Sequence, residues 1–526
     1  MTKLAWTVEL EGHPLRTGRA DAYGVVRLRC DVPEGILKSV TARMDFPLAP
    51  TEKAFFNGYQ SWTWCPEVGP GDRQRGVRQI PGPLLKKYAF DRYGDYHFVA
   101  YPRRPGCFHG FSYGYFRQGE HYRLFASLDE GPGYTIFSYD VKAQVLTITR
   151  DCAGVRHPGG TLAAFDLYFA QGSESAVFDG WFAAMNCRPR ACAPLAGYTS
   201  WYNRYEAITE RDVRNDLRGC RELLQPGDLF QIDDGWEPTV GDWLEPDEAK
   251  FPGGMKALSE EIHKNGFRSG LWLAPFACTE QSQLYRQHPD WLLRKDGKPW
   301  KAGGNWGGFY ALDIDVPAVQ AYLEQVFDRV LNQWGYDLVK LDFLYAAAPF
   351  GTQRESRAGR MIRAMELLRR FCGDKLILGC GVPLMPAFGL VDYCRIGCDV
   401  GLDWANSWVM RRTNREYVST RNAILNSIFR RQLNGRAFLN DPDVFFLRED
   451  NLKLSRDEKF ILATVNSLFG GLLLCSDDMS KYSPEARALY ARLLENREAA
   501  DVQVDADNGL SVAYTVGGVR ERLEID

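Results

Sequence analysis

The stretch AVQAYLEQVFDRVLNQWGYDLVKLDF (318–343) joins a long helical pattern to a short apolar run. Residues 318–334 repeat apolar side chains at helical spacing, whereas YDLVKLDF (336–343) is brief and almost continuously apolar, as in a parallel strand buried on both faces. A helix that leads directly into such a strand is typical of α/β proteins. The stretch therefore predicts a parallel sheet built from repeated βα units.

Runs of the same kind recur on both sides of this stretch. We count eight candidate strands: LAGYTSW (195–201), LFQIDDGW (229–236), RSGLWLAPF (268–276), YDLVKLDF (336–343), DKLILGCG (374–381), DYCRIGCD (392–399), AFLNDPD (437–443) and GGLLLCSDD (470–478). Eight strands in about 290 residues predict a closed (β/α)8 TIM barrel. We assign residues 191–492 to it, within a multidomain α/β chain.

The residues before the barrel have a different hydrophobic pattern. Short runs that alternate apolar and polar residues, separated by Gly and Pro, predict an N-terminal antiparallel β-sandwich; they are VVRLRC (25–30), YRLFASL (122–128), YTIFSY (134–139), QVLTITR (144–150) and LAAFDLYFA (162–170). The helix-like SAVFDGWFAAM (175–185) and the Pro-containing RPRACAP (188–194) follow. We place this domain and its linker at 1–190, and a small C-terminal β element, with a hairpin turn at Asn508-Gly509, at 493–526.

Composition narrows the class of partner. The chain has 526 residues with a formal net charge of −3, from 64 basic and 67 acidic side chains, and no long run of one sign. Such a balance disfavours nucleic acid as a partner. No run approaches the 18 apolar residues that would suggest a membrane span, and the first residues lack a secretory pattern. We expect a protein of the cytoplasm with no membrane partner.

Cysteine and histidine usage argues against metal or disulfide chemistry. The 13 cysteines include no CxxC pair, which gives no sign of a disulfide framework or a structural zinc site. The seven histidines have no ligand-like spacing. We expect no metal and no cofactor. The 14 Trp and 25 Tyr could fill large cores, but they also suit sugar rings, which have apolar faces and hydroxyl edges.

The chemistry of a TIM barrel lies at the carboxyl ends of its strands, and here these ends carry carboxylates. Asp342 follows Lys340 by two residues, so both side chains point the same way and the cation favours an ionised nucleophile. Asp399 follows Arg395 by four residues, in a loop position suited to an acid/base. Such a pair is what a glycosidase requires. From spacing alone, Asp342 could equally cap a helix and Asp399 could form a turn.

Other polar groups at the strand ends suit sugar binding. Asp233-Asp234 before Gly235-Trp236 could hold vicinal hydroxyls, although an isolated DDG string is more often a turn. GGNWGGF (303–309) is not a phosphate loop, because it neither follows a strand nor opens a helix; we interpret it as an aromatic-bearing loop. A lone cysteine such as Cys380 is usually buried filler.

Taken together, the motifs resemble α-galactosidases of glycoside hydrolase family 36, of the compact bacterial type. The matching stretches, in family order, are NGYQSW (57–62), GYTSWYNRY (197–205), QIDDGW (231–236), GLWLAPF (270–276), VKLDF (339–343), LGCGVP (378–383), RIGCD (395–399), LNDPD (439–443) and CSDD (475–478). The resemblance implies a retaining, exo-acting enzyme that removes terminal α-galactose through a covalent intermediate.

The resemblance also implies roles for individual residues. Asp342 would be the nucleophile and Asp399 the acid/base. Asp233 and Asp234 would hold the O4 and O6 edge of galactose, and Lys340 would bind hydroxyls beside the nucleophile. Arg395 and Cys380 would lie near the 2-hydroxyl. The predicted aromatic walls are Trp201, Trp236 and Trp272, with Trp62 and Trp64 reaching over from the N-terminal domain.

The same resemblance leaves alternatives open. Larger members carry Asn-Arg soon after the nucleophile, where this chain has Phe343-Leu344-Tyr345, and the C-terminal β element is short. An α-N-acetylgalactosaminidase or an α-galactosyl transglycosylase would use the same carboxylates. A non-catalytic carbohydrate-binding protein would not need both Asp342 and Asp399. The expected partner is a small oligosaccharide of the raffinose or melibiose type.

Overall fold

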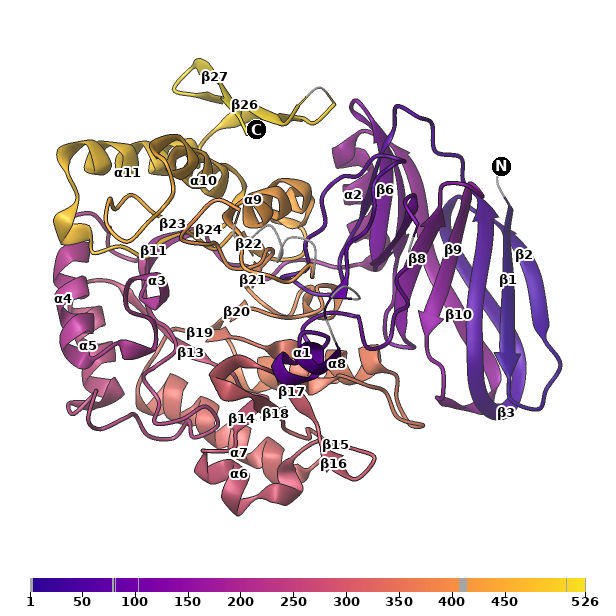
Figure 1. Ribbon diagram of the computed structural model, residues 1–526, viewed down its shortest axis with the longest axis horizontal. Helices are drawn as coiled ribbons and strands as arrows, with labels where there is room; N and C mark the ends of the chain where they lie inside the picture. The colour runs from indigo at the N-terminus through magenta and orange to yellow at the C-terminus, as the bar shows by residue number, and fades with distance from the viewer. Residues whose placement is uncertain are drawn as a thin grey trace.

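The computed structural model describes residues 3–77, 80, 82–102, 104–405, 414–507 and 509–525. Figure 1 shows long antiparallel strands at its right-hand side, a parallel sheet with its helices in the centre and left, and a small group of strands at the top near the C-terminus. The chain therefore divides into antiparallel and parallel regions, as the sequence predicts.

Ten strands form the antiparallel region: β1 (Lys3–Leu10), β2 (Arg16–Asp21), β3 (Gly24–Asp45), β4 (Lys53–Phe56), β5 (Cys107–Phe111), β6 (Tyr113–Gln118), β7 (His121–Ser127), β8 (Tyr134–Asp140), β9 (Val145–Asp151) and β10 (Arg156–Gly172). The long strand β3 pairs with β10 through its first half and with β1 and β9 through its second half. It thereby joins two ladders, whose apolar side chains share one buried core. All five predicted runs lie in these strands.

Helix α2 (Glu174–Met185) follows, where the sequence predicts a helix. Ser173 caps its first turn and Asn186 ends it in a left-handed conformation. Its buried Trp181 donates to the carbonyl of Ser127 at 2.7 Å, which fastens the helix to β7. A short helix, α1 (Gly82–Tyr88), lies in the connection between β4 and β5.

The parallel sheet contains one strand from each of the eight predicted runs, plus one more short strand. In spatial order they are β22 (Leu439–Asp441), β21 (Tyr393–Arg395), β20 (Leu376–Gly379), β19 (Leu338–Leu341), β13 (Arg268–Leu273), β12 (Leu229–Ile232), β11 (Leu195–Thr199), β24 (Leu472–Cys475) and β23 (Val444–Phe445). The two ends of this order, β22 and β23, are separated in the chain only by Pro442 and Asp443.

Helices connect and cover these strands (Figure 1). They are α3 (Trp201–Arg204), α4 (Glu210–Cys220), α5 (Gly254–Lys264), α6 (Gln283–Gln287), α7 (Pro317–Asp328), α8 (Arg357–Cys372), α9 (Thr420–Phe429), α10 (Arg456–Phe469) and α11 (Pro484–Asn496). Two of these helices begin with reciprocal capping boxes, which Thr209 and Asp212 form at α4 and Ser455 and Glu458 form at α10. The helical pattern at 318–334 forms α7 and a π-helical turn, Arg329–Gln333.

Smaller sheets complete the fold. β14 (Ala277–Thr279), β17 (Lys301–Gly303) and β18 (Phe309–Ala311) pair with one another, as do β15 (Arg294–Lys295) and β16 (Lys298–Pro299). At the C-terminus β25 (Ala500–Asp505) and β26 (Ser511–Val516) form the predicted hairpin, and β27 (Val519–Glu524) extends it to three strands. Asn508, half of the predicted turn, lies outside the described residues.

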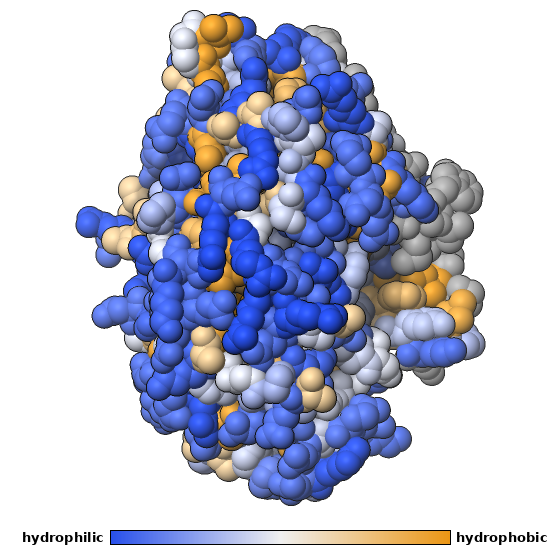
Figure 2. All heavy atoms as spheres, turned by 90° about the vertical axis from the view of Figure 1, so that its left-hand side faces the viewer, coloured by the Kyte–Doolittle hydropathy of each residue, from blue (hydrophilic) through white to orange (hydrophobic). Residues whose placement is uncertain are grey.

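The surface over α4, α5 and α11 is mainly hydrophilic (Figure 2). Among the helices described, none combines the length and the apolar character that crossing a bilayer would require.

Candidate active site

The predicted catalytic residues lie at one edge of the parallel sheet. Asp233 and Asp234 directly follow β12, Asp342 directly follows β19, and Asp399 follows β21 by four residues. Since the strands are parallel, their carboxyl ends meet at the same edge. The sheet thus gathers side chains that are far apart in the sequence.

The carboxylate of Asp342 is held by two donors. Its Oδ1 accepts from the backbone N–H of Phe343 at 2.8 Å, and its Oδ2 accepts from Nε1 of Trp272 at 3.2 Å. Phe343 adopts φ 53°, a left-handed conformation that is costly for an aromatic residue. Burial raises the pKa of Asp342; the Lys340 ammonium opposes this and the Asp399 carboxylate adds to it. Asp342 and Asp399 therefore interact electrostatically.

Lys340 joins the nucleophile candidate to the Asp233 side of the site. Its Nζ lies 2.7 Å from Oδ2 of Asp233, and both side chains are buried. Burial alone would lower the pKa of Lys340, but the Asp233 carboxylate raises it well above its usual value. The same Asp233 oxygen accepts from the side chains of Gln231 at 3.1 Å and Thr199 at 3.3 Å. The pair is therefore fixed as an ionised salt bridge with its orientation set by neighbours.

Asp234 lies beside Asp233 but has different partners. Its Oδ2 accepts from Nε1 of Trp306 at 2.9 Å, and its carboxyl group is hydrogen-bonded to that of the buried Glu237. Burial and then the Glu237 charge raise the pKa of Asp234 well above its usual value. Two buried carboxyl groups in contact hold one proton between them, so Asp234 can donate as well as accept.

Arg395 organises the side of the site that contains Asp399. Its guanidinium contacts three carboxylates: Asp399 at 2.8 Å, Asp441 at 3.0 Å and Asp443 at 2.8 Å. Asp443 also accepts from the hydroxyl of Tyr202 and from the backbone N–H of Val400 at 2.8 Å. Burial raises the pKa of Asp443 to about 7, with Arg395 opposing. One cation among three carboxylates leaves excess negative charge, and a proton on Asp443 relieves it.

The N-terminal region reaches into the site through Trp62. Its Nε1 donates to Sγ of Cys380 at 3.3 Å, and its ring meets that of Phe343 with centroids 5.1 Å apart. The Cys380 thiol is in turn hydrogen-bonded to Asp342. At Gly381, which has φ 59°, an added Cβ would lie only 2.8 Å from the Trp62 ring. The absence of a side chain there allows Trp62 to come close.

Arg430, at the end of α9, holds the loop that carries Trp62. It is fully buried and donates to Asn57 Oδ1 at 3.0 Å, to the carbonyl of Gln60 at 3.2 Å and to that of Ser61. It also donates to the carbonyl of Ile396, next to Arg395. A buried guanidinium is costly unless its donors are satisfied, so this loop and the parallel sheet are tightly joined.

The predicted aromatic residues differ in how they are placed relative to the catalytic candidates. Trp272 contacts Asp342 directly, whereas Trp236 is 0% exposed and donates to the carbonyl of Trp272, so it supports that residue from behind. Trp201 is partly exposed and packs against Tyr205 at 5.2 Å between ring centroids. Trp64 lines a separate cavity, where Arg75 lies over its ring. The predicted role of Trp64 is not matched by a contact with these carboxylates.

Sequence reasoning missed several members of this cluster: Trp306, Glu237, Tyr202, Asp441 and Asp443. Trp306 is in the segment interpreted as an aromatic-bearing loop, and Asp441 and Asp443 are in the quoted LNDPD motif. Within the described part of the chain, no group of three or more His, Cys, Asp or Glu side chains is arranged to hold a metal ion.

Comparisons with known proteins identify a family model and several similar structures. The family model "Melibiase" matches residues 218–365. Among solved structures, the α-galactosidase from Thermus thermophilus in complex with p-nitrophenyl α-D-galactopyranoside superposes with a TM-score of 0.75 and 29% identity, covering 95% of this chain and 99% of that one. The GH36 α-galactosidase AgaA from Geobacillus stearothermophilus, at 14% identity and a TM-score of 0.60, covers 97% of this chain and 80% of its own and shows the same fold.

Curated relatives match over a shorter stretch. AgaA is 30% identical over 150 residues, and an Escherichia coli α-galactosidase is 29% identical over 151 residues. These alignments span 20% and 21% of the relatives' length and 27% of this chain. The Thermus enzyme in complex with stachyose, in contrast, is 30% identical over 98% of its own chain and 93% of this one. Because this match spans nearly both chains, the protein belongs to glycoside hydrolase family 36, the family of these α-galactosidases.

Proposed function

We propose that the protein is a retaining, exo-acting α-galactosidase that removes terminal α-linked galactose from oligosaccharides. The observation that carries the proposal is the carboxylate of Asp342, oriented by the Phe343 N–H and the Trp272 indole and electrostatically linked to both Lys340 and Asp399. A carbohydrate-binding protein needs neither a fixed carboxylate nor a second one beside it.

The fold supports the proposal in its finer details as well. The parallel sheet begins and ends with strands that are adjacent in the chain, so we infer that it closes as a (β/α)8 barrel in residues 191–492. The shared core of the two N-terminal ladders supports a β-sandwich domain with its linker in 1–190, and β25–β27 form the C-terminal element in 493–526.

The proposed reaction is a double displacement. Asp342 attacks C1 of the sugar while Asp399 protonates the departing glycosidic oxygen, which gives a covalent glycosyl-enzyme. Asp399 then takes a proton from water as the water attacks C1, and this releases galactose in the α configuration. Arg395 holds Asp399 during both steps, and Lys340 favours the charged form of Asp342. The reaction needs no cofactor.

Specificity rests on the opposite side of the sugar. Asp233, fixed by Lys340, accepts hydrogen bonds from hydroxyls, and Asp234 with its shared proton accepts or donates. We assign these two residues to the O4 and O6 edge of galactose, with the Trp306 and Trp272 rings alongside. Arg395 and Cys380 face the 2-hydroxyl in this assignment. Buried polar groups that lose a partner reject the wrong sugar strongly.

Relatives indicate the class of substrate. Solved complexes of the Thermus enzyme contain stachyose, and one of AgaA contains raffinose. We propose the same small oligosaccharides as substrates here. All thirteen cysteines are unpaired, which supports a reducing compartment such as the cytoplasm as the place of action.

The test is hydrolysis of 4-nitrophenyl α-galactoside beside the α-glucoside, the α-N-acetylgalactosaminide and the β-galactoside, with the first anomer followed by proton NMR. We expect rapid turnover of the α-galactoside alone and release of α-galactose first. Release of β-galactose first would exclude Asp342 as a nucleophile, because it would mean inversion. Preference for the α-N-acetylgalactosaminide would favour the alternative activity, that of an α-N-acetylgalactosaminidase.

A further inference from the structure

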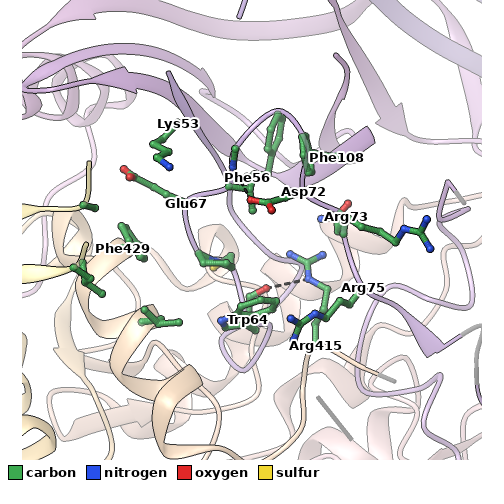
Figure 3. Close-up of a pocket in the computed structure, with 18 of the residues that line it drawn as sticks. Lys53, Phe56, Trp64, Glu67, Asp72, Arg73, Arg75, Phe108, Arg415 and Phe429 are labelled. Carbon is green, nitrogen blue, oxygen red and sulfur yellow. Dashed lines mark hydrogen bonds between the residues drawn. The ribbon is translucent and has the colours of Figure 1, made fainter. Parts of the chain in front are cut away.

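A second cavity lies where the N-terminal strands, helix α9 and the C-terminal strands meet (Figure 3). Its volume is about 1270 Å³. Its described lining includes Lys53, Trp64, Arg73, Arg75, Arg415 and Arg421, and it includes neither Asp342 nor Asp399. We call it the junction cavity. The proposed reaction makes no use of it.

The junction cavity carries an excess of positive charge. Its described lining has five cationic side chains, Lys53, Arg73, Arg75, Arg415 and Arg421, and three acidic ones, Glu67, Asp72 and Asp507. Glu67 is held by Arg117, outside the lining, at 2.7 and 2.6 Å, and Asp507 lies 3.1 Å from the same guanidinium. Arg117 offsets one of these two negative charges, and the five cations of the lining still outnumber its three acids.

Several of these cations are available to a ligand. Within the described residues, the side chains of Lys53, Arg73 and Arg421 make no ion pair or hydrogen bond. Arg415 donates to neutral oxygens, the carbonyl of Trp64 at 3.0 Å and the hydroxyl of Tyr101 at 3.4 Å, although the charges of Asp95 and Glu416 act on it. Figure 3 shows the guanidinium groups of Arg75 and Arg415 together beside Trp64.

Trp64 adds a donor and an apolar surface. Its Nε1 is buried and has no acceptor among the described residues, and Arg75 lies 4.7 Å from its ring centroid. A buried N–H without an acceptor costs free energy, which a ligand oxygen would recover. Phe56, Phe108 and Phe429 supply an apolar lining nearby. The cavity wall therefore combines groups that bind anions with an apolar surface that can contact the organic part of a ligand.

We propose that the junction cavity binds a small phosphate monoester. Guanidinium groups pair with phosphate oxygens through two hydrogen bonds each, and the Trp64 N–H and the aromatic side chains would receive the rest of the molecule. The volume exceeds what one phosphate ion needs and lies above the range of about 300 to 1,000 Å³ that is usual for small-molecule sites, so the ester would fill only part of the cavity. The proposal concerns binding and stands apart from the activity at Asp342.

Isothermal titration calorimetry at low salt, with the full chain, tests the proposal. The probes are glucose 6-phosphate, AMP and inorganic phosphate, with glucose as the neutral control, in the presence of excess galactose to occupy the catalytic site. We expect one site for at least one of the two esters, at least about tenfold tighter than for inorganic phosphate, weakened by salt, and no binding of glucose. Equal affinity for inorganic phosphate, or loss of binding in galactose, would overturn the proposal.

Matched variants locate the binding. Arg75→Gln should weaken the ester at least about tenfold and Trp64→Phe, which removes the N–H donor together with part of the ring surface, about threefold to tenfold. Arg19→Gln, an exposed arginine on β2, removes the same charge elsewhere and should change nothing. Thermal unfolding of each variant confirms that it is folded. Unchanged affinity in both folded variants, or no binding of any anion by the unaltered chain, would refute the site.

Discussion

Asp342 and Asp399 end two strands of the same sheet but lie in opposite environments. Asp342 is partly buried, accepts from a backbone N–H and an indole, and lies close to Lys340. Asp399 is 40% exposed and its side chain contacts Arg395 at 2.8 Å. One carboxylate is fixed at several points, whereas the other is held at one and reaches water.

The difference matches the two tasks of a retaining glycosidase. A nucleophile must approach C1 in a defined geometry and in the charged form, so several donors and a cation suit it. An acid/base must give up a proton and recover it from water within one turnover, so it needs access to solvent. The predictions that follow test this division, from the largest expected effect to the smallest.

Removing the nucleophile should have the largest effect. Asp342→Asn should lower kcat on 4-nitrophenyl α-galactoside by at least roughly 10⁴-fold, because no covalent intermediate can form. The control is Asp337→Asn, which makes the same change just before β19, at the opposite end of the same strand. It should keep kcat within about twofold. Comparable losses in both variants would show that the site is not at the carboxyl end of the sheet.

Removing the acid/base should have an effect that depends on the leaving group. Asp399→Asn should lower kcat/KM on raffinose by roughly 10² to 10⁴-fold but much less on 2,4-dinitrophenyl α-galactoside, whose leaving group departs without a proton. Azide should then accelerate the reaction and yield α-galactosyl azide, because it attacks the intermediate without general base help. Equal losses on both substrates, with no azide product, would remove Asp399 from this role.

Displacing Trp62 from the site should have the next largest effect. Gly381→Ala puts a methyl group 2.8 Å from the Trp62 ring, so the indole must move away from Cys380 and Phe343. We expect kcat/KM for the α-galactoside to fall by about 10 to 100-fold, as small displacements at a reacting centre do.

Gly373→Ala is the matched control for that variant. Gly373 has φ 54°, close to the 59° of Gly381, but nothing lies within 4 Å of its added Cβ. Both variants should lose stability, because φ is positive at each site and strains a residue that has a Cβ. Kinetics measured on both therefore separate the contact with Trp62 from backbone strain, and equal kcat/KM values would show that Trp62 does not shape the site.

The comparison also shows what could be read from the sequence. The positions of Asp342 and Asp399 could be predicted because each follows an apolar run typical of a buried strand, and parallel strands place their ends together. Spacing alone leaves other roles open for both residues, and their assignment as a catalytic pair comes from the family resemblance. The Asp234–Glu237 pair was hidden, because a shared proton depends on burial that spacing does not reveal.

Aromatic residues illustrate the same limit. Trp236 and Trp272 look alike in their motifs, but only the structure shows that Trp236 lies behind Trp272. Trp62 and Trp64 are two residues apart, but Trp62 contacts Cys380 and Trp64 lines the junction cavity, since the loop that carries them is held by the distant Arg430. Trp306 contacts Asp234 from a loop residue with φ 53°, a conformation that sequence patterns do not predict for tryptophan.

The smallest predicted effect concerns Asp443, which shares Arg395 with Asp399. Its pKa rises to about 7 in the folded protein, above the value of about 3.9 for an unfolded chain. The folded state therefore binds the extra proton, and stability contributed by it is present below about pH 4 and is lost as pH rises towards 7. Asp443→Asn is neutral at every pH and should not show this loss.

The measurement is the melting temperature of both proteins from pH 4.5 to 8. The asparagine of the variant carries no charge and cannot form an ion pair with Arg395, but the difference between variant and unaltered protein should shift in favour of the variant as pH rises. Tyr202→Phe, which removes the hydroxyl that donates to Asp443, should enlarge the loss with pH, because that hydroxyl favours the charged carboxylate. If the difference in melting temperature between Asp443→Asn and the unaltered protein does not change with pH, Asp443 does not carry the proton. Another carboxyl group around Arg395 would then hold it and would relieve the excess negative charge beside Asp399.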